Sequence, residues 1–226
     1  MWRMIEHSSL IIGLSFALVV TSLTAVELRH LKWASIAYVA QALLIVALLV
    51  SYGTLLPNHT LYLWAITVLI TKATIIPLML RHYLQKTTLE ETPPSLGFGV
   101  SLAIGAAVLA GFYWLIDGHM GWLAPSAALA GEPYATNLSV AFTILAFGLY
   151  GLLSRRDALK SVISVCLIEN AVHLSLVSLA PGIPETAMIG IVTDVVVSVW
   201  ILLIIVTGIH EQIGSTDIRE LSKLQG

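Results

Sequence analysis

Three ionisable side chains lie near the middle of long apolar stretches, namely Lys72, Glu169 and Asp194. Each stretch is long enough to cross a bilayer, where a charge costs roughly 2.5 to 3.5 kcal/mol on insertion scales. Charged residues at that depth usually pair with one another or mark the path of an ion. The sequence therefore predicts a functional site inside the membrane.

Glu169 is the first candidate, because His173 lies four residues later on the same face of a helix and Asn170 is adjacent. A carboxyl and an imidazole at this spacing could share or relay a proton near neutral pH. The alternative is structural: a neutral Glu169 hydrogen-bonded to a neighbouring helix, and a His173 that only packs in the core.

Asp194 is the second acid, preceded by Thr193 and followed one turn later by Ser198. Its short side chain cannot reach a membrane interface from the middle of a span, so it must face protein or water. We expect it to act in ion transfer, and the alternative is a hydrogen bond that joins two helices.

Lys72 has Pro77 five residues later, and a proline removes one backbone hydrogen bond and can kink a helix. The carbonyl of Ala73 would then lose its donor and lie close to the ammonium group. Lys72 could alternate between charged and neutral forms in a proton path, or form a fixed ion pair with Glu169 or Asp194. The sequence leaves both alternatives open.

Two further polar residues have supporting or structural interpretations. Gln41 is a candidate hydrogen-bonding neighbour of the charged residues, with simple helix packing as the alternative. Cys166, the single cysteine, is most simply a small core residue and cannot supply the thiolates of an iron-sulfur cluster. The seven histidines show no metal-ligand spacing, so we expect neither a metal nor a redox cofactor in this chain.

The elements that position these residues are predicted to be seven transmembrane helices. The 226 residues are 58% hydrophobic and 11% charged, which excludes an ordinary soluble domain. The sequence has no block of basic residues, which argues against a nucleic-acid partner. Apolar stretches of span length are helical because lipid offers the backbone no hydrogen bonds. The expected spans are 6–27, 33–53, 60–83, 95–116, 136–154, 159–180 and 184–210.

The basic residues predict the orientation of these helices, because cytoplasmic loops retain Lys and Arg. In a seven-helix arrangement only Arg3 lies on one side, so the N-terminus is expected outside and the C-terminus in the cytoplasm. The basic residues on the other side are Arg29, Lys32, Arg81, Lys86, Arg155, Arg156, Lys160, Arg219 and Lys223.

The chain also aligns weakly with itself. Placing Lys32 on Lys160 brings Gln41 onto Glu169, and a shorter outer turn brings Lys72 onto Asp194. We therefore predict two parallel three-helix repeats, helices 1 to 3 and 5 to 7, around an inserted helix 4. The single membrane domain 1–226 would comprise a first unit, 1–92, an insertion with an outer loop, 93–134, and a second unit with a cytoplasmic tail, 135–226.

The second unit resembles the K-subunit family of respiratory complex I and its antiporter relatives, including the Mrp antiporter C subunit. The resemblance rests on LIENAVHLSLVSLAPGIPETAMIGIVTDVVVSVWILLIIV and the tail STDIRELSKLQG. It implies one mid-membrane acid in each of two helices, which match Glu169 and Asp194. The second is usually Glu in that family, so Asp194 departs from the pattern by one methylene.

Over residues 8–226 the chain resembles the hydrogenase-4 component E family, on the stretches ITKATIIPLML, CLIENAVHL and IGIVTD. The resemblance implies a non-redox subunit of a group 4 membrane-bound [NiFe] hydrogenase of the formate-hydrogenlyase type in a prokaryotic inner membrane. Partner subunits would hold the [NiFe] centre and the iron-sulfur clusters, and antiporter-like subunits would lie beside this chain.

Three functions follow from these features. In the first, Glu169 and Asp194, with Lys72, His173 and Gln41, pass protons or sodium ions laterally at half-membrane depth, coupled to electron transfer. In the second, the chain is a structural adaptor that stabilises such a complex and conducts no ions. The third, an independent transporter, is disfavoured because inverted repeats and broken helices are expected there.

Overall fold

The computed structural model describes residues 2–56, 58–85, 98–154 and 157–213. This part of the chain is nearly all helical and contains no strand, and seven of its helices are long and apolar enough to span a membrane. The spans are His7–Glu27, Leu31–Leu55, His59–Leu84, Gly99–Leu123, Tyr134–Ser154, Ala158–Leu179 and Ile189–Glu211. The all-α fold and the seven predicted spans are confirmed; the orientation of the termini, the repeat and the division into units stay predictions.

The spans correspond to helices of similar bounds, some of them divided. The third span is α3, a π-helical turn η1 and α4, and the fourth span is α5 with the short α6, followed by η2. The helices are α1 (Trp2–Glu27), α2 (Leu31–Leu55), α3 (His59–Ile70), η1 (Thr71–Ile75), α4 (Ile76–Leu84), α5 (Phe98–Asp117), α6 (Met120–Leu123), η2 (Ala127–Leu129), α7 (Tyr134–Ser154), α8 (Ala158–Leu179) and α9 (Glu185–Ile213).

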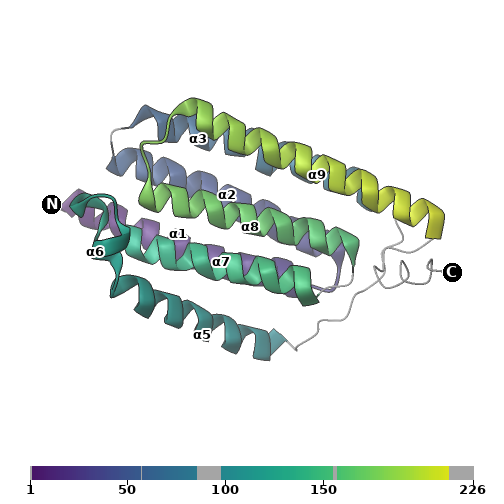
Figure 1. Ribbon diagram of the computed structural model, residues 1–226, viewed down its shortest axis with the longest axis horizontal. Helices are drawn as coiled ribbons and strands as arrows, with labels where there is room; N and C mark the ends of the chain where they lie inside the picture. Colours follow the sequence, from purple (N-terminus) through teal and green to yellow (C-terminus); the bar gives the residue numbers. More distant parts are fainter. Residues whose placement is uncertain (1, 57, 86–97, 155–156, 214–226) are drawn as a thin grey trace.

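The spans lie side by side in one bundle (Figure 1). Helices α1, α2, α7 and α8 pack closely together, and α7 and α8 share the most extensive contact. Helix α5 lies against α7 and α1 at one edge, and α9 lies against α3, α4 and α8 at the other. Only 17% of the α5 span and 24% of the α9 span are buried, so both edges present surface to lipid or to partner proteins.

The start of α8 is capped by Asp157 and is joined to the end of α1 by Lys160. The Asp157 carboxylate accepts hydrogen bonds from the backbone N–H groups of Leu159 and Lys160, which caps α8. The Lys160 side chain is 1% exposed, and its ammonium donates to the carbonyls of Ala25, Val26 and Leu28 at the end of α1. A cation at this position stabilises the carbonyls that a helix C-terminus leaves unpaired.

Glycine allows α7 to approach α8 closely. A Cβ atom at Gly148 would lie 2.6 Å from Ile168 Cγ1 and 3.0 Å from both the Ile168 nitrogen and the Ser164 carbonyl oxygen. Two of these neighbours are backbone atoms, so a side chain at this position would force the helices apart. Small residues at such crossings are typical of membrane helix packing.

We expect Gly148→Ala to lower the stability of the bundle by about 1 to 3 kcal/mol, the usual cost of overpacking. The measurement is the melting temperature of the purified chain in detergent. Gly111→Ala is the control, because a Cβ atom there would meet nothing within 4 Å and alanine favours the helix. Equal melting temperatures for the two variants would contradict the close contact.

Candidate functional site

The bundle interior contains a continuous row of polar side chains from five of its elements. Helix α8 contributes Glu169, Asn170 and His173, η1 contributes Lys72, and α2 contributes Gln41. The row ends at Ser22 on α1 and at Trp64 on α3. The other six side chains are buried and Glu169 is 13% exposed, so the row lies inside protein along almost its whole length.

Glu169 is the centre of this row. Its Oε1 atom lies 3.0 Å from Lys72 Nζ and 3.0 Å from His173 Nε2. The other oxygen, Oε2, is buried and has no hydrogen-bond partner among the described residues. The sequence left Glu169 and Asp194 as alternative partners of Lys72, and the structure pairs Lys72 with Glu169. An ammonium this close to a carboxylate compensates for the loss of water around both groups.

Lys72 is positioned by the π-helical turn η1. The N–H of Ile76 donates to the carbonyl of Thr71, five residues back, so the third span contains one wide turn just before α4, which has Pro77 in its first turn. Such π turns are rare and often occur at functional sites. The expectation that the ammonium lies at a carbonyl freed by Pro77 is not met, because Lys72 Nζ contacts the side chains of Asn170 and Glu169.

On one side of the ion pair, a chain of amides holds Lys72. Lys72 Nζ donates to Asn170 Oδ1 at 2.7 Å, and Asn170 Nδ2 donates to Gln41 Oε1 at 3.1 Å. Gln41 Nε2 then donates to Ser22 Oγ at 2.6 Å, and Ser22 donates to the carbonyl of Leu18. Every amide therefore has one orientation, set by the ammonium that only donates. The side chains of Asn170, Gln41 and Ser22 do not ionise near neutral pH, so none of them can take up or release a proton.

On the other side, Trp64 fixes the tautomer of His173. The indole Nε1–H donates to His173 Nδ1 at 3.1 Å, and an indole nitrogen can only donate. Nδ1 is therefore the acceptor nitrogen, so the proton of the neutral imidazole is on Nε2 and faces Glu169. A second proton could not enter at Nδ1 unless the Trp64 contact broke. In this arrangement His173 Nε2 lies 3.0 Å from Glu169 Oε1, while the other ring nitrogen accepts from Trp64.

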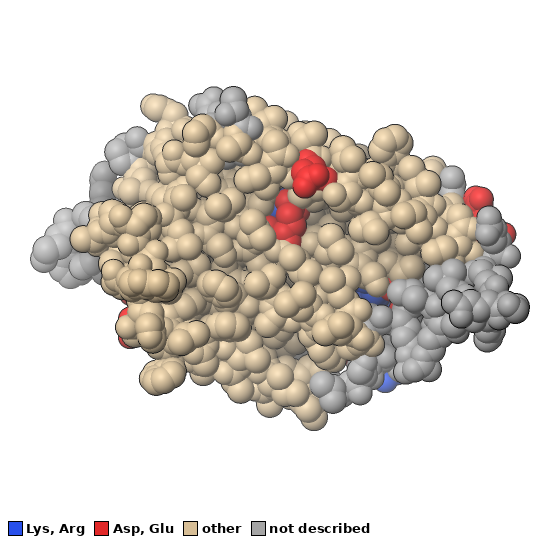
Figure 2. All heavy atoms as spheres, in the orientation of Figure 1, with Lys and Arg blue, Asp and Glu red and all other residues tan. Residues whose placement is uncertain are grey.

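Among the described residues, Asp194 has no hydrogen bond or ion pair with the side chains of this row. It is exposed on α9, and the adjacent Thr193 is also exposed and donates its hydroxyl to the carbonyl of Ile189. Ser198, one turn later, is half-buried. Figure 2 shows acidic side chains near the middle of the face formed by α8 and α9, with a small basic surface beside them and uncharged surface around both. The structure therefore brings Glu169, Lys72, His173, Asn170 and Gln41 together, and leaves Asp194 and Thr193 exposed and Ser198 half-buried on α9.

The sequence analysis missed Ser22 and Trp64. Ser22 gave no signal, because serines within spans commonly bond to their own helix, as Ser22 also does. Trp64 gave little signal either, because it is the sixth residue of the span His59–Leu84, near the interface where tryptophans usually gather. A buried indole needs an acceptor, and His173 supplies it.

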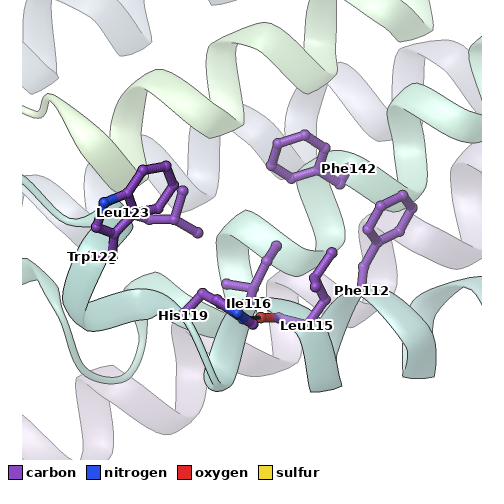
Figure 3. A pocket seen from close by; sticks show the side chains of 7 residues that line it. All are labelled: Phe112, Leu115, Ile116, His119, Trp122, Leu123 and Phe142. Atoms are coloured by element: carbon purple, nitrogen blue, oxygen red, sulfur yellow. Dashed lines mark hydrogen bonds between the residues drawn. The ribbon is translucent and has the colours of Figure 1, made fainter.

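A separate hollow of about 260 Å³ lies between α5, α6 and α7 (Figure 3). Its walls are apolar apart from His119, whose Nδ1 is hydrogen-bonded to the carbonyl of Leu115. Its wall residues are Phe112, Leu115, Ile116, His119, Trp122, Leu123 and Phe142. It contains no residue of the polar row. No group of three metal-ligating side chains occurs in the described part of the chain either.

Comparison with known proteins gives one relative that matches nearly the whole chain and one family model that matches its C-terminal part. Hydrogenase-4 component E from Escherichia coli K12 is 26% identical over 219 residues, which cover 97% of this chain and 99% of the relative. The chain is a homologue of hydrogenase-4 component E. The Shigella flexneri protein of the same name is equally similar. Residues 137–226 match the family model of NADH-ubiquinone/plastoquinone oxidoreductase chain 4L.

The two relationships place the site within shared sequence. The hydrogenase-4 homology spans the polar row, and the chain 4L match includes both acids, Glu169 and Asp194. No solved structure matches the chain. With seven apolar helices and a full-length relationship to hydrogenase-4 component E, the chain is a multi-pass membrane protein.

Proposed function

We propose that this chain is a non-redox membrane subunit of a complex I-like [NiFe] hydrogenase of the hydrogenase-4 or formate-hydrogenlyase type. The full-length homology to hydrogenase-4 component E and the chain 4L match of the second half support this role. A single cysteine cannot hold a [NiFe] centre or an iron-sulfur cluster, both of which need several thiolates. These groups belong to partner subunits in a prokaryotic inner membrane.

Within such a complex, Glu169 is the group that takes up and releases a proton. The observation that carries this proposal is its buried ion pair with Lys72, 3.0 Å away, beside a carboxylate oxygen that has no hydrogen-bond partner among the described residues. A proton arriving on Oε2 would cancel the charge that faces Lys72. The ammonium would then be held by Asn170 alone, so proton uptake and the position of Lys72 are linked.

Asp194 is the second proton carrier and the exit toward a partner subunit. Its carboxylate is exposed on α9 within the span Ile189–Glu211, where contact with lipid would be unfavourable. An antiporter-like subunit packed on this face would give Asp194 polar surroundings. Protons would then pass laterally at half-membrane depth, with sodium ions as the alternative transported ion.

A structural adaptor is the competing proposal, and the amide chain favours it. Asn170, Gln41 and Ser22 form a satisfied network that joins α8, α2 and α1. A network of this kind gives a bundle one arrangement of its helices. Under this proposal, changing Glu169 alters assembly or stability but leaves ion coupling in the assembled complex unchanged.

Purification under mild conditions from native membranes tests the assembly itself. We expect the chain to co-purify with antiporter-like membrane subunits and with peripheral hydrogenase subunits, in fractions that evolve hydrogen from a low-potential donor. Mass spectrometry identifies the subunits, and gas chromatography measures the hydrogen. Recovery of the chain alone, with hydrogen evolution in other fractions, would overturn the proposed function.

A further inference from the structure

A groove of about 770 Å³ lies between the start of α2 and the end of α4, away from the polar row. Its α2 wall follows one helical face at spacings of three and four residues, as does its α4 wall. The residues that form it are Lys32, Ser35, Ile36, Val39, Pro77, Arg81, Leu84 and Gln85. The groove is independent of the hydrogenase role proposed above.

The groove changes from polar to apolar with depth. Lys32 is the second residue of α2 and Arg81 is three residues before the end of α4, so both cations lie within about 5 Å of the ends of their helices. Ile36, Val39 and Pro77 lie one to two turns deeper. A molecule that fits this gradient has an anionic head at the membrane surface and a hydrocarbon part below it.

Two details indicate that the polar end of the groove accommodates an anion. Both cations are exposed, and no acidic residue contributes to the described walls. In addition, Ser35 Oγ is buried and has no hydrogen-bond partner among the described residues. A buried hydroxyl without a partner is costly unless an acceptor is supplied from outside the chain.

We propose that this groove binds an anionic phospholipid. The phosphate is held between the Lys32 ammonium and the Arg81 guanidinium and accepts a hydrogen bond from Ser35. The first carbons of an acyl chain pack on Ile36, Val39 and Pro77. Basic pockets between membrane helices are a general means of binding acidic headgroups. A free anion would leave the apolar half of the groove without a function.

The test measures lipid binding to the purified full-length chain by native mass spectrometry. After delipidation, the chain is titrated with phosphatidylglycerol and with phosphatidylcholine of the same acyl chains. We expect tighter binding of phosphatidylglycerol, and a loss of about 20- to 30-fold in the double variant Lys32→Gln/Arg81→Gln, since each basic residue near the surface contributes about a fivefold factor. The matched control is Arg29→Gln, which removes an exposed charge outside the groove walls.

Unchanged phosphatidylglycerol binding in the double variant, or equal binding of the two lipids by the native chain, would overturn the proposal. Displacement of the lipid by inorganic phosphate alone would also overturn it, because the groove would then be an anion site. The remaining alternative is that a partner subunit, and not a lipid, occupies the groove. A photo-crosslinking residue at position 35 in the purified complex distinguishes the two. Crosslinking to lipid supports the proposal, and crosslinking to a partner subunit contradicts it.

Discussion

The variant Glu169→Gln is expected to assemble and to evolve hydrogen, yet to lose the membrane potential that accompanies hydrogen turnover. Glutamine has the same length and can still accept at Oε1 from Lys72 and His173, both 3.0 Å away in the native chain. It cannot take up or release a proton. Lys72 loses its counter-ion, which lowers the stability of the chain, but it keeps hydrogen-bond acceptors in Asn170 and in the glutamine, so we expect the helices to stay joined. Coupling should therefore fall to the level seen with a protonophore.

The measurement uses inverted membrane vesicles with a potential-sensitive dye and hydrogen evolution recorded in parallel. Glu211→Gln is the matched control, because it removes an exposed carboxylate near the end of α9 and should leave coupling intact. Normal coupling in a fully assembled Glu169→Gln complex would exclude the proton-carrier role. Loss of assembly with normal coupling per remaining complex would favour the adaptor.

Hydropathy was sufficient to predict the seven spans. Long apolar stretches in lipid must close their own backbone hydrogen bonds, so length and composition determine where the helices lie. The predicted span 60–83 thus agrees with His59–Leu84, and 136–154 agrees with Tyr134–Ser154. The π turn Thr71–Ile75 was not predicted, because its single wide turn leaves no trace in the pattern of apolar residues.

The site was predicted less completely, for a geometric reason. A sequence gives the depth of a residue in a span, but the packing of the helices determines which side of the span faces inward. Lys72, Glu169 and Asp194 have similar predicted depths, yet Lys72 is buried against Glu169 and Asp194 is exposed. The link from Lys72 through Asn170 to Gln41 depends equally on the rotation of three helices.

Removal of Lys72 alone is expected to destabilise the chain more than removal of the whole ion pair. In Lys72→Met, the apolar side chain fills a similar volume but leaves Glu169 without a counter-ion. Breaking one side of a buried pair usually costs about 3 to 5 kcal/mol. Asn170 Oδ1 also loses its donor, and the amide chain to Gln41 is left without the ammonium that orients it.

The double variant Lys72→Met/Glu169→Gln distinguishes this charge effect from a simple packing defect. With no charge left in the row, we expect the melting temperature to recover most of the loss seen in Lys72→Met. The native chain, Lys72→Met, Glu169→Gln and the double variant together form a double-mutant cycle. The stability of each is measured by thermal unfolding in detergent. Additive losses would mean that Lys72 and Glu169 do not interact. A strong coupling energy would show that the ion pair between Lys72 and Glu169 holds η1 against α8. The proposed link between proton uptake and the position of Lys72 requires this interaction.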